Sequence, residues 1–339
     1  MPLGECLINS HRSSLQTQRY TEREVGHVAV FAVTDNIFGI DLYEEGRPGR
    51  SCAYVIRARE PVLVETGSAR SHPALVKGLE EVGVYPSDLR HIIVTHVHLD
   101  HAGGVGQMME VSPKALLHCH PRALPHIIDP SRLIAGAQAV YGDQAEDIFG
   151  PVKPVAKERV VAQGDETMLD AKGHELVFYD TPGHAKHHLC VIDQSTGSLF
   201  SGDTVGIRYT RAYTGWPFEW GFPTTTPSDF NPDVLLETLD RLLSRRPRRV
   251  CHTHYGVTEP ARAAFDFTRR GLQRIQAMMT RLSETSTQSE VQSLLTSTVR
   301  QELDAIGHPE VDVGAVALDI FLNSQGILVY LQKRAVGKL

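Results

Sequence analysis

The run T-H-V-H-L-D-H at residues 95–101 constrains the fold of this chain more than any other feature. It places three imidazoles and one carboxylate within seven residues, directly after a short apolar run that is typical of a buried strand. On a strand that leads into a helix, His96 and His98 point the same way, because side chains alternate along a strand. Asp100 and His101 then lie on the turn. This pattern can supply two ligands to one metal ion and two to a neighbouring ion.

Three further positions extend this pattern along the chain. His184 lies in the run D-T-P-G-H, Asp203 lies in S-G-D-T and His254 lies in C-H-T-H-Y-G, each at the end of an expected strand. Any one of them alone is typical of a structural residue. Together with the first run, four strand-end motifs in this order indicate a metal centre that folding assembles from distant parts of the chain.

The alternation of short β-branched runs and helical periods predicts two β-sheets with helices packed outside them. Strands are expected at residues 27–33, 36–43, 51–57, 61–65, 91–95, 115–118, 159–162, 175–180, 189–192, 198–201 and 249–252. Helices are expected at residues 71–83, 102–110, 232–244 and about 259–282, with a mixed and mostly helical stretch up to about residue 149.

The ends of the chain differ from this central part. We expect a polar leader, a catalytic domain and a C-terminal helical extension, at residues 1–20, 21–282 and 283–339. The leader lacks the apolar middle of a signal peptide. The extension begins with the polar stretch 283–290, continues with helical periods over 291–303 and 313–331, and is interpreted as a packing or dimerisation unit.

The composition excludes several classes of protein. A chain of 339 residues with 41% hydrophobic and 22% charged residues can bury a sizeable core. The net charge of −6 gives no reason to expect nucleic acid as a partner, and the basic run 245–249 is more simply a solvated turn. No stretch approaches the roughly 18 to 20 consecutive apolar residues that span a bilayer. Five scattered cysteines without a C-x-x-C pair indicate reduced thiols, and we expect a cytoplasmic protein.

The sequence resembles the metallo-β-lactamase-fold hydrolase superfamily. Within it, the chain is similar to the dinuclear branch that includes glyoxalase II-type thioesterases and N-acyl-homoserine lactonases. The resemblance rests on T-H-x-H-x-D-H and T-P-G-H-x-x-x-H and covers roughly residues 25–275. It implies an α/β fold of the α+β kind, in which an αββα four-layer sandwich carries the metals at one edge between the sheets. The C-terminal helical extension would follow this sandwich.

The resemblance also implies a ligand set. The first metal would be held by His96, His98 and His184, the second by Asp100, His101 and His254, and Asp203 would bridge them. We therefore expect two divalent metal ions per chain, with Zn²⁺ as the first choice and iron or manganese as alternatives. The chain departs from the family at Glu65, where an aspartate usually supports the site.

Two cations bridged by a carboxylate can hold a hydroxide at neutral pH and polarise the carbonyl that it attacks. The pattern thus predicts a hydrolase with Asp100 and Asp203 in the catalytic centre, and the resemblance implies that its substrates are carboxylic-acid derivatives (thioester, ester or lactone). His188, four residues after His184, has either a catalytic or a structural role. The alternatives are a mononuclear-iron persulfide dioxygenase, a phosphodiesterase of the same fold, and a binding protein that has lost turnover.

Substrate choice is expected to depend on the segment at residues 209–222, which holds six aromatic residues including both tryptophans. We interpret it as an aromatic wall over the metals, with a packed loop or a dimer contact as the alternative. Tyr209 or Tyr213 would donate a hydrogen bond to the substrate carbonyl, as the resemblance to lactonases implies. The expected partner is a small molecule with an acyl or aromatic group, and neither nucleic acid nor a membrane. A homodimer is a further interpretation.

Overall fold

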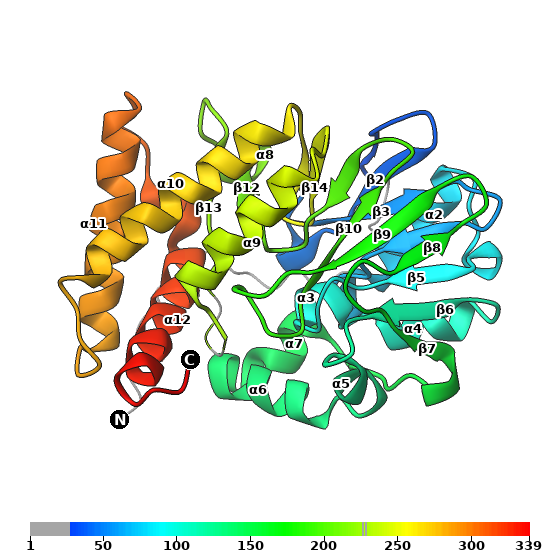
Figure 1. The fold of residues 1–339 in the computed structure, drawn as a ribbon, viewed down its shortest axis with the longest axis horizontal. Helices are drawn as coiled ribbons and strands as arrows, with labels where there is room; N and C mark the ends of the chain where they lie inside the picture. The colour runs from blue at the N-terminus through cyan, green and yellow to red at the C-terminus, as the bar shows by residue number, and fades with distance from the viewer. Residues whose placement is uncertain (1–27, 226, 228) are drawn as a thin grey trace.

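A computed structural model describes residues 28–225, 227 and 229–339. Two β-sheets lie face to face, and helices cover their outer surfaces (Figure 1). This is the mixed α/β sandwich that the sequence predicted. The polar leader expected at residues 1–20 lies outside the described residues.

The first sheet has seven strands in the order β1-β2-β3-β4-β5-β6-β7. Its first four strands pair antiparallel, and the pairs from β4 to β7 are parallel. The strands are β1 (Val30–Ala32), β2 (Ile37–Asp41), β3 (Cys52–Ile56), β4 (Val62–Val64), β5 (His91–Ile93), β6 (Leu116–Cys119) and β7 (Val160–Ala162).

The second sheet has six strands in the order β15-β14-β11-β10-β9-β8. They are β8 (Met168–Asp170), β9 (Glu175–Asp180), β10 (Leu189–Asp193), β11 (Ser198–Phe200), β14 (Arg249–His252) and β15 (Gly256–Thr258). The strands β9, β11 and β14 run in one direction, because β11 pairs with β14 in parallel and β10 is antiparallel to both of its neighbours. A separate hairpin joins β12 (Ile207–Tyr209) to β13 (Trp220–Phe222) and was not expected from the sequence.

The longer helices form where the sequence predicted them. The helices are α2 (His72–Glu81), α3 (Leu99–Ala102), α4 (Val105–Val111), α5 (Leu124–Ile128), α6 (Ser131–Tyr141), α7 (Ala145–Phe149), α8 (Arg211–Thr214), α9 (Pro232–Ser244), α10 (Ala261–Met279), α11 (Gln288–Ala305) and α12 (Ala317–Ala335). The polar stretch at 283–290 is partly helical, because Thr287 and Glu290 form a capping box that starts α11. Similarly, the side chain of Asn231 caps α9, and Pro232 occupies its first turn.

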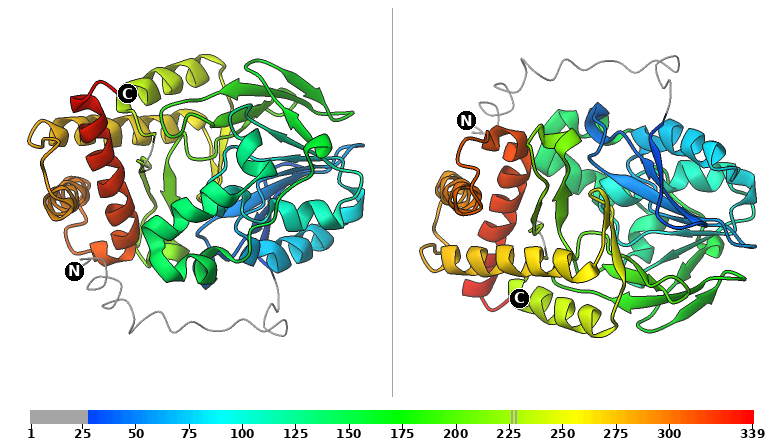
Figure 2. Two further views of the ribbon diagram at one scale, coloured as in Figure 1. Left: turned by 90° about the horizontal axis from the view of Figure 1, so that it is seen from below. Right: turned by 90° about the horizontal axis from the view of Figure 1, so that it is seen from above.

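Three groups of buried apolar side chains hold these layers together. One lies between the sheets, a second lies between the first sheet and its helices, and the third extends from the second sheet through the β12–β13 hairpin to α12. The helices α10, α11 and α12 form one end of the molecule, as Figure 2 shows. The C-terminal helices therefore share a continuous core with the sandwich.

The segment made of α12 and the short helical turn before it is unusually apolar. Within the described part of the chain, Val313–Ala335 alone is long and apolar enough to cross a membrane, and half of its most apolar stretch is buried in the fold. Burial of this kind is typical of a core helix as well, so the expectation of no membrane partner stays a prediction.

Candidate metal centre

The predicted ligands follow the carboxyl ends of strands that meet at one edge of the sandwich. His96 and His98 follow β5, and His184 follows β9. Asp203 and His254 follow β11 and β14. Because β9, β11 and β14 run in the same direction, their ends lie at the same edge of the second sheet. Asp100 and His101 lie in the single turn of α3, which places them one step further along the same edge.

Three imidazoles form the first ligand group. The Nε2 atom of His96 lies 2.7 Å from Nδ1 of His98, which in turn lies 3.3 Å from Nε2 of His184. Hydroxyl groups hold the opposite ring nitrogens: Thr95 Oγ1 lies 3.1 Å from His96 Nδ1, and Thr224 Oγ1 lies 2.7 Å from His184 Nδ1. These outer contacts orient the rings so that their inner nitrogens converge.

Asp203 lies between this group and a second one. Its Oδ2 atom is 3.4 Å from Nε2 of His184, while its Oδ1 atom is 3.1 Å from Nε2 of His101 and 3.2 Å from Nε2 of His254. The Oδ2 atom of Asp100 completes the second group, 3.4 Å from His254 Nε2 and 3.7 Å from His101 Nε2. The two oxygens of Asp203 thus face different groups, as a bridging carboxylate requires.

The electrostatics of the two groups differ. Burial lowers the pKa of His184 to about 3, so its ring is neutral. Burial also acts to lower the pKa of His254, but the Asp203 charge and hydrogen bonds with Asp100 and Asp203 outweigh it and raise the pKa to about 9. Burial would raise the pKa of Asp203, but the charge of His101 outweighs it and holds this pKa well below its usual range. Without metal, the second group is therefore an array of imidazolium and carboxylate ions.

This donor set fits metal ions. Three overlapping sets of three side chains have ligand atoms within 4.8 Å of one another: His96, His98 and His184; His96, His101 and Asp203; and Asp100, His101 and His254. Oδ1 of Asp203 and both ring nitrogens of His101 are buried, and among the described residues they face other charged groups only at ion-pair distances of 3.1 to 3.7 Å. Imidazole and carboxylate donors of this kind suit zinc, iron or manganese.

His188 lies behind these ligands, and its contacts favour a positioning role. Its Nε2 atom accepts a hydrogen bond from the backbone N–H of Asp203 at 3.1 Å, and its Nδ1 atom lies 2.8 Å from Thr181 Oγ1. Its ring stacks on His96 with the centroids 4.8 Å apart. Gly202 adopts a φ of +47°, and a Cβ there would lie only 2.5 Å from His188 Nε2. Both nitrogens are thus occupied, so the imidazole orients Asp203 and supports His96.

Glu65 takes the supporting position that the family usually gives to aspartate. It is fully buried in a left-handed conformation with φ of +70°, directly after β4. Its Oε1 atom accepts hydrogen bonds from the hydroxyls of Thr95 and Thr253 and lies 3.4 Å from Nδ1 of His101. One carboxylate thereby connects the segments after β4, β5 and β14.

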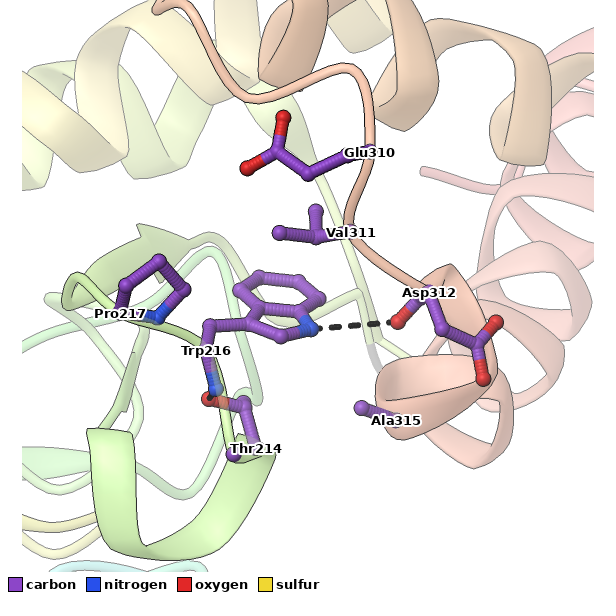
Figure 3. Close-up of a pocket in the computed structure, with 8 residues that line it drawn as sticks. Thr214, Trp216, Pro217, Glu310, Val311, Asp312 and Ala315 are labelled. Carbon is purple, nitrogen blue, oxygen red and sulfur yellow. Dashed lines mark hydrogen bonds between the residues drawn. The ribbon is translucent and has the colours of Figure 1, made fainter.

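The aromatic segment packs into the core, which corresponds to the packed-loop alternative. The side chains of Tyr209, Tyr213, Trp216, Trp220 and Phe222 are all buried in the core that α9 to α12 share. The indole N–H of Trp216 donates to the backbone oxygen of Asp312 at 3.1 Å. Both residues line a pocket between α8 and the loop that precedes α12 (Figure 3). The segment therefore connects the sandwich to the C-terminal helices.

The two tyrosines proposed as carbonyl donors lie beside a buried ion pair. The guanidinium of Arg50 forms a bidentate pair with Asp319 of α12, with distances of 2.9 and 2.7 Å. The Tyr213 ring lies 5.3 Å from this guanidinium, and burial together with the charge of Asp319 raises the pKa of the nearby Tyr209. No motif marks Arg50, Thr224 or Asp319, so sequence reasoning missed them.

Comparison with known proteins agrees with this fold. The sequence profile of the metallo-beta-lactamase superfamily matches residues 46–254, which is more than half of the chain. The crystal structure of ST1585, an archaeal superfamily protein from Sulfolobus tokodaii, superposes with a TM-score of 0.62 at 21% identity and covers 87% of this chain and 98% of that one. At this identity the likeness shows the fold.

Among curated relatives, ST1585 of Sulfurisphaera tokodaii is 28% identical over 51% of this chain and 62% of its own length. The acyl-coenzyme A thioesterase MBLAC2 of Gallus gallus is 27% identical over 44% of this chain and 51% of its own length. The thioesterase pkgB of Emericella nidulans is 25% identical over 56% of this chain and 48% of its own length. The chain thus spans about half to two thirds of the length of these relatives.

Proposed function

Because the chain belongs to the metallo-beta-lactamase superfamily, we propose that it is a metal-dependent hydrolase whose substrate is an acyl thioester. The observation that carries the proposal is the position of Asp203, whose two carboxylate oxygens face two separate ligand groups. Two relatives named as thioesterases support the choice of thioester over lactone or simple ester. The same proposal includes a small-molecule substrate, no nucleic-acid or membrane partner, and a cytoplasmic location.

Two groups of side chains would hold the two metal ions. His96, His98 and His184 would hold one ion, Asp100, His101 and His254 would hold the other, and Asp203 would bridge them. When bound, the two ions supply Lewis acidity and an activated water for attack on a carbonyl. Zn²⁺ is the proposed metal, and the seven imidazole and carboxylate donors suit it.

The exposure of the ligands supports one direction of approach for the proposed substrate. The Asp100 side chain is 35% exposed, whereas those of His101, Asp203 and His254 are at most 7% exposed. His98 is also half-buried. The acyl group would therefore reach the centre over Asp100 and His98, while the buried ligands hold the site rigid and exclude bulk water.

The role of carbonyl donor considered for Tyr209 and Tyr213 is not part of this proposal. Both side chains are buried in the core that they share with the C-terminal helices, and the Tyr213 ring lies 5.3 Å from the guanidinium of Arg50.

The test is metal analysis of the purified chain together with a panel of acyl thioesters, lactones, aryl esters and bis-aryl phosphates. We expect about two metal equivalents per chain and the highest kcat/KM on thioesters. Lactone or phosphodiester cleavage as the main activity would contradict the proposed substrate. One iron per chain with oxygen consumption on a persulfide would replace the hydrolase proposal.

A further inference from the structure

Asn323 of α12 forms hydrogen bonds with the backbone at both ends of the segment at residues 223–225. Its Oδ1 atom accepts the backbone N–H of Thr225 at 2.7 Å, and its Nδ2 group donates to the backbone oxygen of Pro223 at 3.3 Å. The hydroxyl of Thr225 donates to the backbone oxygen of Asn323 at 2.7 Å. Both Asn323 and Thr225 are buried, so these hydrogen bonds are shielded from competing water.

The residue between the two held positions is Thr224, which contacts the metal centre. Its Oγ1 atom lies 2.7 Å from Nδ1 of His184 and 3.4 Å from the backbone oxygen of Asp203. Because Asn323 fixes the backbone on either side of Thr224, it also fixes where this hydroxyl lies. Partners of this kind set the tautomer and orientation of a metal-binding histidine, so the effect passes on to Nε2 of His184.

The opposite side of this segment is equally constrained. Gly271 of α10 packs against Pro223, and a Cβ at that glycine would lie 2.4 Å from Cδ of the proline ring. The segment therefore lies between α10 and α12 and has little freedom to compensate if Asn323 is lost. The C-terminal helices thus form the outer support of one ligand of the metal centre.

We propose that Asn323 is a positioning residue for the metal ligand His184, acting through Thr224, and that the C-terminal extension is in this way a component of the metal centre. The inference rests on the proposed metal binding. The inference goes beyond the proposed metal binding, because it assigns a role in the metal centre to α12, a helix that carries none of the sequence motifs. Neither Asn323 nor Thr224 would contact substrate in this role.

The direct test compares Asn323→Ala with Ser324→Ala. Both changes remove a buried polar side chain from α12, but the Ser324 hydroxyl bonds to Phe321 and Gln288, away from the centre. Zinc affinity is measured for each purified variant by competition with a chromophoric chelator. We expect Asn323→Ala to weaken one of the two zinc sites about 10- to 100-fold, as loss of a ligand's supporting partner does. Ser324→Ala should bind both ions as the unaltered chain does.

A second measurement separates positioning from general packing. Thr224→Val removes the hydroxyl that contacts His184 while keeping the side-chain shape, and Thr224→Ser should restore affinity. If Asn323 acts through Thr224, the combined change Asn323→Ala with Thr224→Val should cost no more affinity than the larger single change. Should Asn323→Ala fail to fold, Thr225→Val replaces it, since this change removes the hydroxyl that donates to Asn323.

Independent of turnover, NMR of the His184 ring in the metal-free chain should show one dominant tautomer, and mixed tautomers in Asn323→Ala. Additive effects in the double variant, or unchanged zinc affinity and an unchanged tautomer in Asn323→Ala, would overturn the inference. If the unaltered chain binds no metal at all, the proposed function fails instead, which is a separate result.

Discussion

At the scale of single residues, Asp203 determines whether the two ligand groups act as one centre. Its Oδ1 and Oδ2 atoms lie 3.1 Å from His101 and 3.4 Å from His184, respectively. Asp203→Ala should remove the bridge and lower both metal content and kcat/KM by orders of magnitude, about 100-fold or more. Asp170→Ala, at an exposed position of the second sheet, is the matched control. Near-normal turnover with two bound metals would show that Asp203 is not the bridge.

His101 tests how many metals the centre holds. His101→Ala should selectively weaken the second ion, so that titration shows about one equivalent, because His96, His98 and His184 still hold the first. The control is His187→Ala, whose ring centroid lies 5.6 Å from that of His98 but which is outside the ligand sets. An unchanged stoichiometry in His101→Ala would favour a mononuclear centre, and with it the dioxygenase alternative.

Protons should compete with the second metal. The pKa of His254 in the metal-free protein is raised to about 9, above the ordinary value near 6.5, so its ring is protonated at pH 7.5. In the metal-free chain, this charge stabilises the fold fully below about pH 6.5, and the effect is lost as the pH rises through about 9. Metal binding requires the neutral ring and must therefore release this proton.

Calorimetric zinc titration at pH 7.5 in two buffers of different ionisation enthalpy measures that release. If about one proton is released, the apparent binding enthalpies in the two buffers should differ by at least about the difference between the buffers' ionisation enthalpies. We also expect zinc affinity to rise between pH 6 and 9. A heat that is the same in both buffers would show that the second group is already neutral.

At the scale of elements, the β12–β13 hairpin packs into the core that it shares with the C-terminal helices. The sequence had led us to expect an aromatic wall over the metals instead. Trp216 is 5% exposed and its indole is hydrogen-bonded to the loop before α12. Trp216→Ala should therefore cost about 3–5 kcal/mol of unfolding free energy, as other large core truncations do. It should leave the ratio of kcat/KM between long and short acyl substrates unchanged.

Urea denaturation and a series of acyl thioesters of increasing length measure these two effects. Tyr85→Ala, which truncates a ring that is 57% exposed, should change stability by less than about 0.5 kcal/mol. A loss of activity that grows with acyl length, at unchanged stability, would restore the wall interpretation.

The C-terminal helices also show why an element boundary is hard to place from sequence. The polar stretch at 283–290 suggested the boundary between the catalytic domain and the C-terminal extension, and its Thr287 and Glu290 are the capping box of α11. Buried residues of α11 and α12 then enter the same core as α9 and α10, among them Val291, Leu295 and Ile327. Polar composition marks both linkers and helix starts, so it cannot distinguish the two.

At the scale of the whole molecule, the sandwich was predictable because its signals are local. Helix α9 forms over the expected residues 232–244, since Asn231 caps it and its apolar residues recur at helical spacing. The predicted ligands converge because each follows the carboxyl end of a strand, and the strand directions place these ends at one edge. The strand β8 and the β12–β13 hairpin were not expected, because their runs Met-Leu-Asp, Ile-Arg-Tyr and Trp-Gly-Phe contain no two consecutive β-branched residues. The equally short β5 and β7 contain such pairs and were expected.

The sequence alone determined the sandwich architecture, because hydrophobic period and capping residues are properties of neighbouring positions. Which seven side chains meet followed from the resemblance of the sequence motifs to a known family. The tertiary structure decided what supports these side chains. Asn323 meets Thr225 across 98 positions and Arg50 meets Asp319 across 269, and neither contact belongs to a repeating pattern. The tertiary structure also decided the role of His188. From the sequence its ring nitrogens could face either substrate or structural partners, and in the fold they contact the backbone N–H of Asp203 and the hydroxyl of Thr181. Such contacts depend on how separate elements pack, and packing is fixed only when the whole chain has folded.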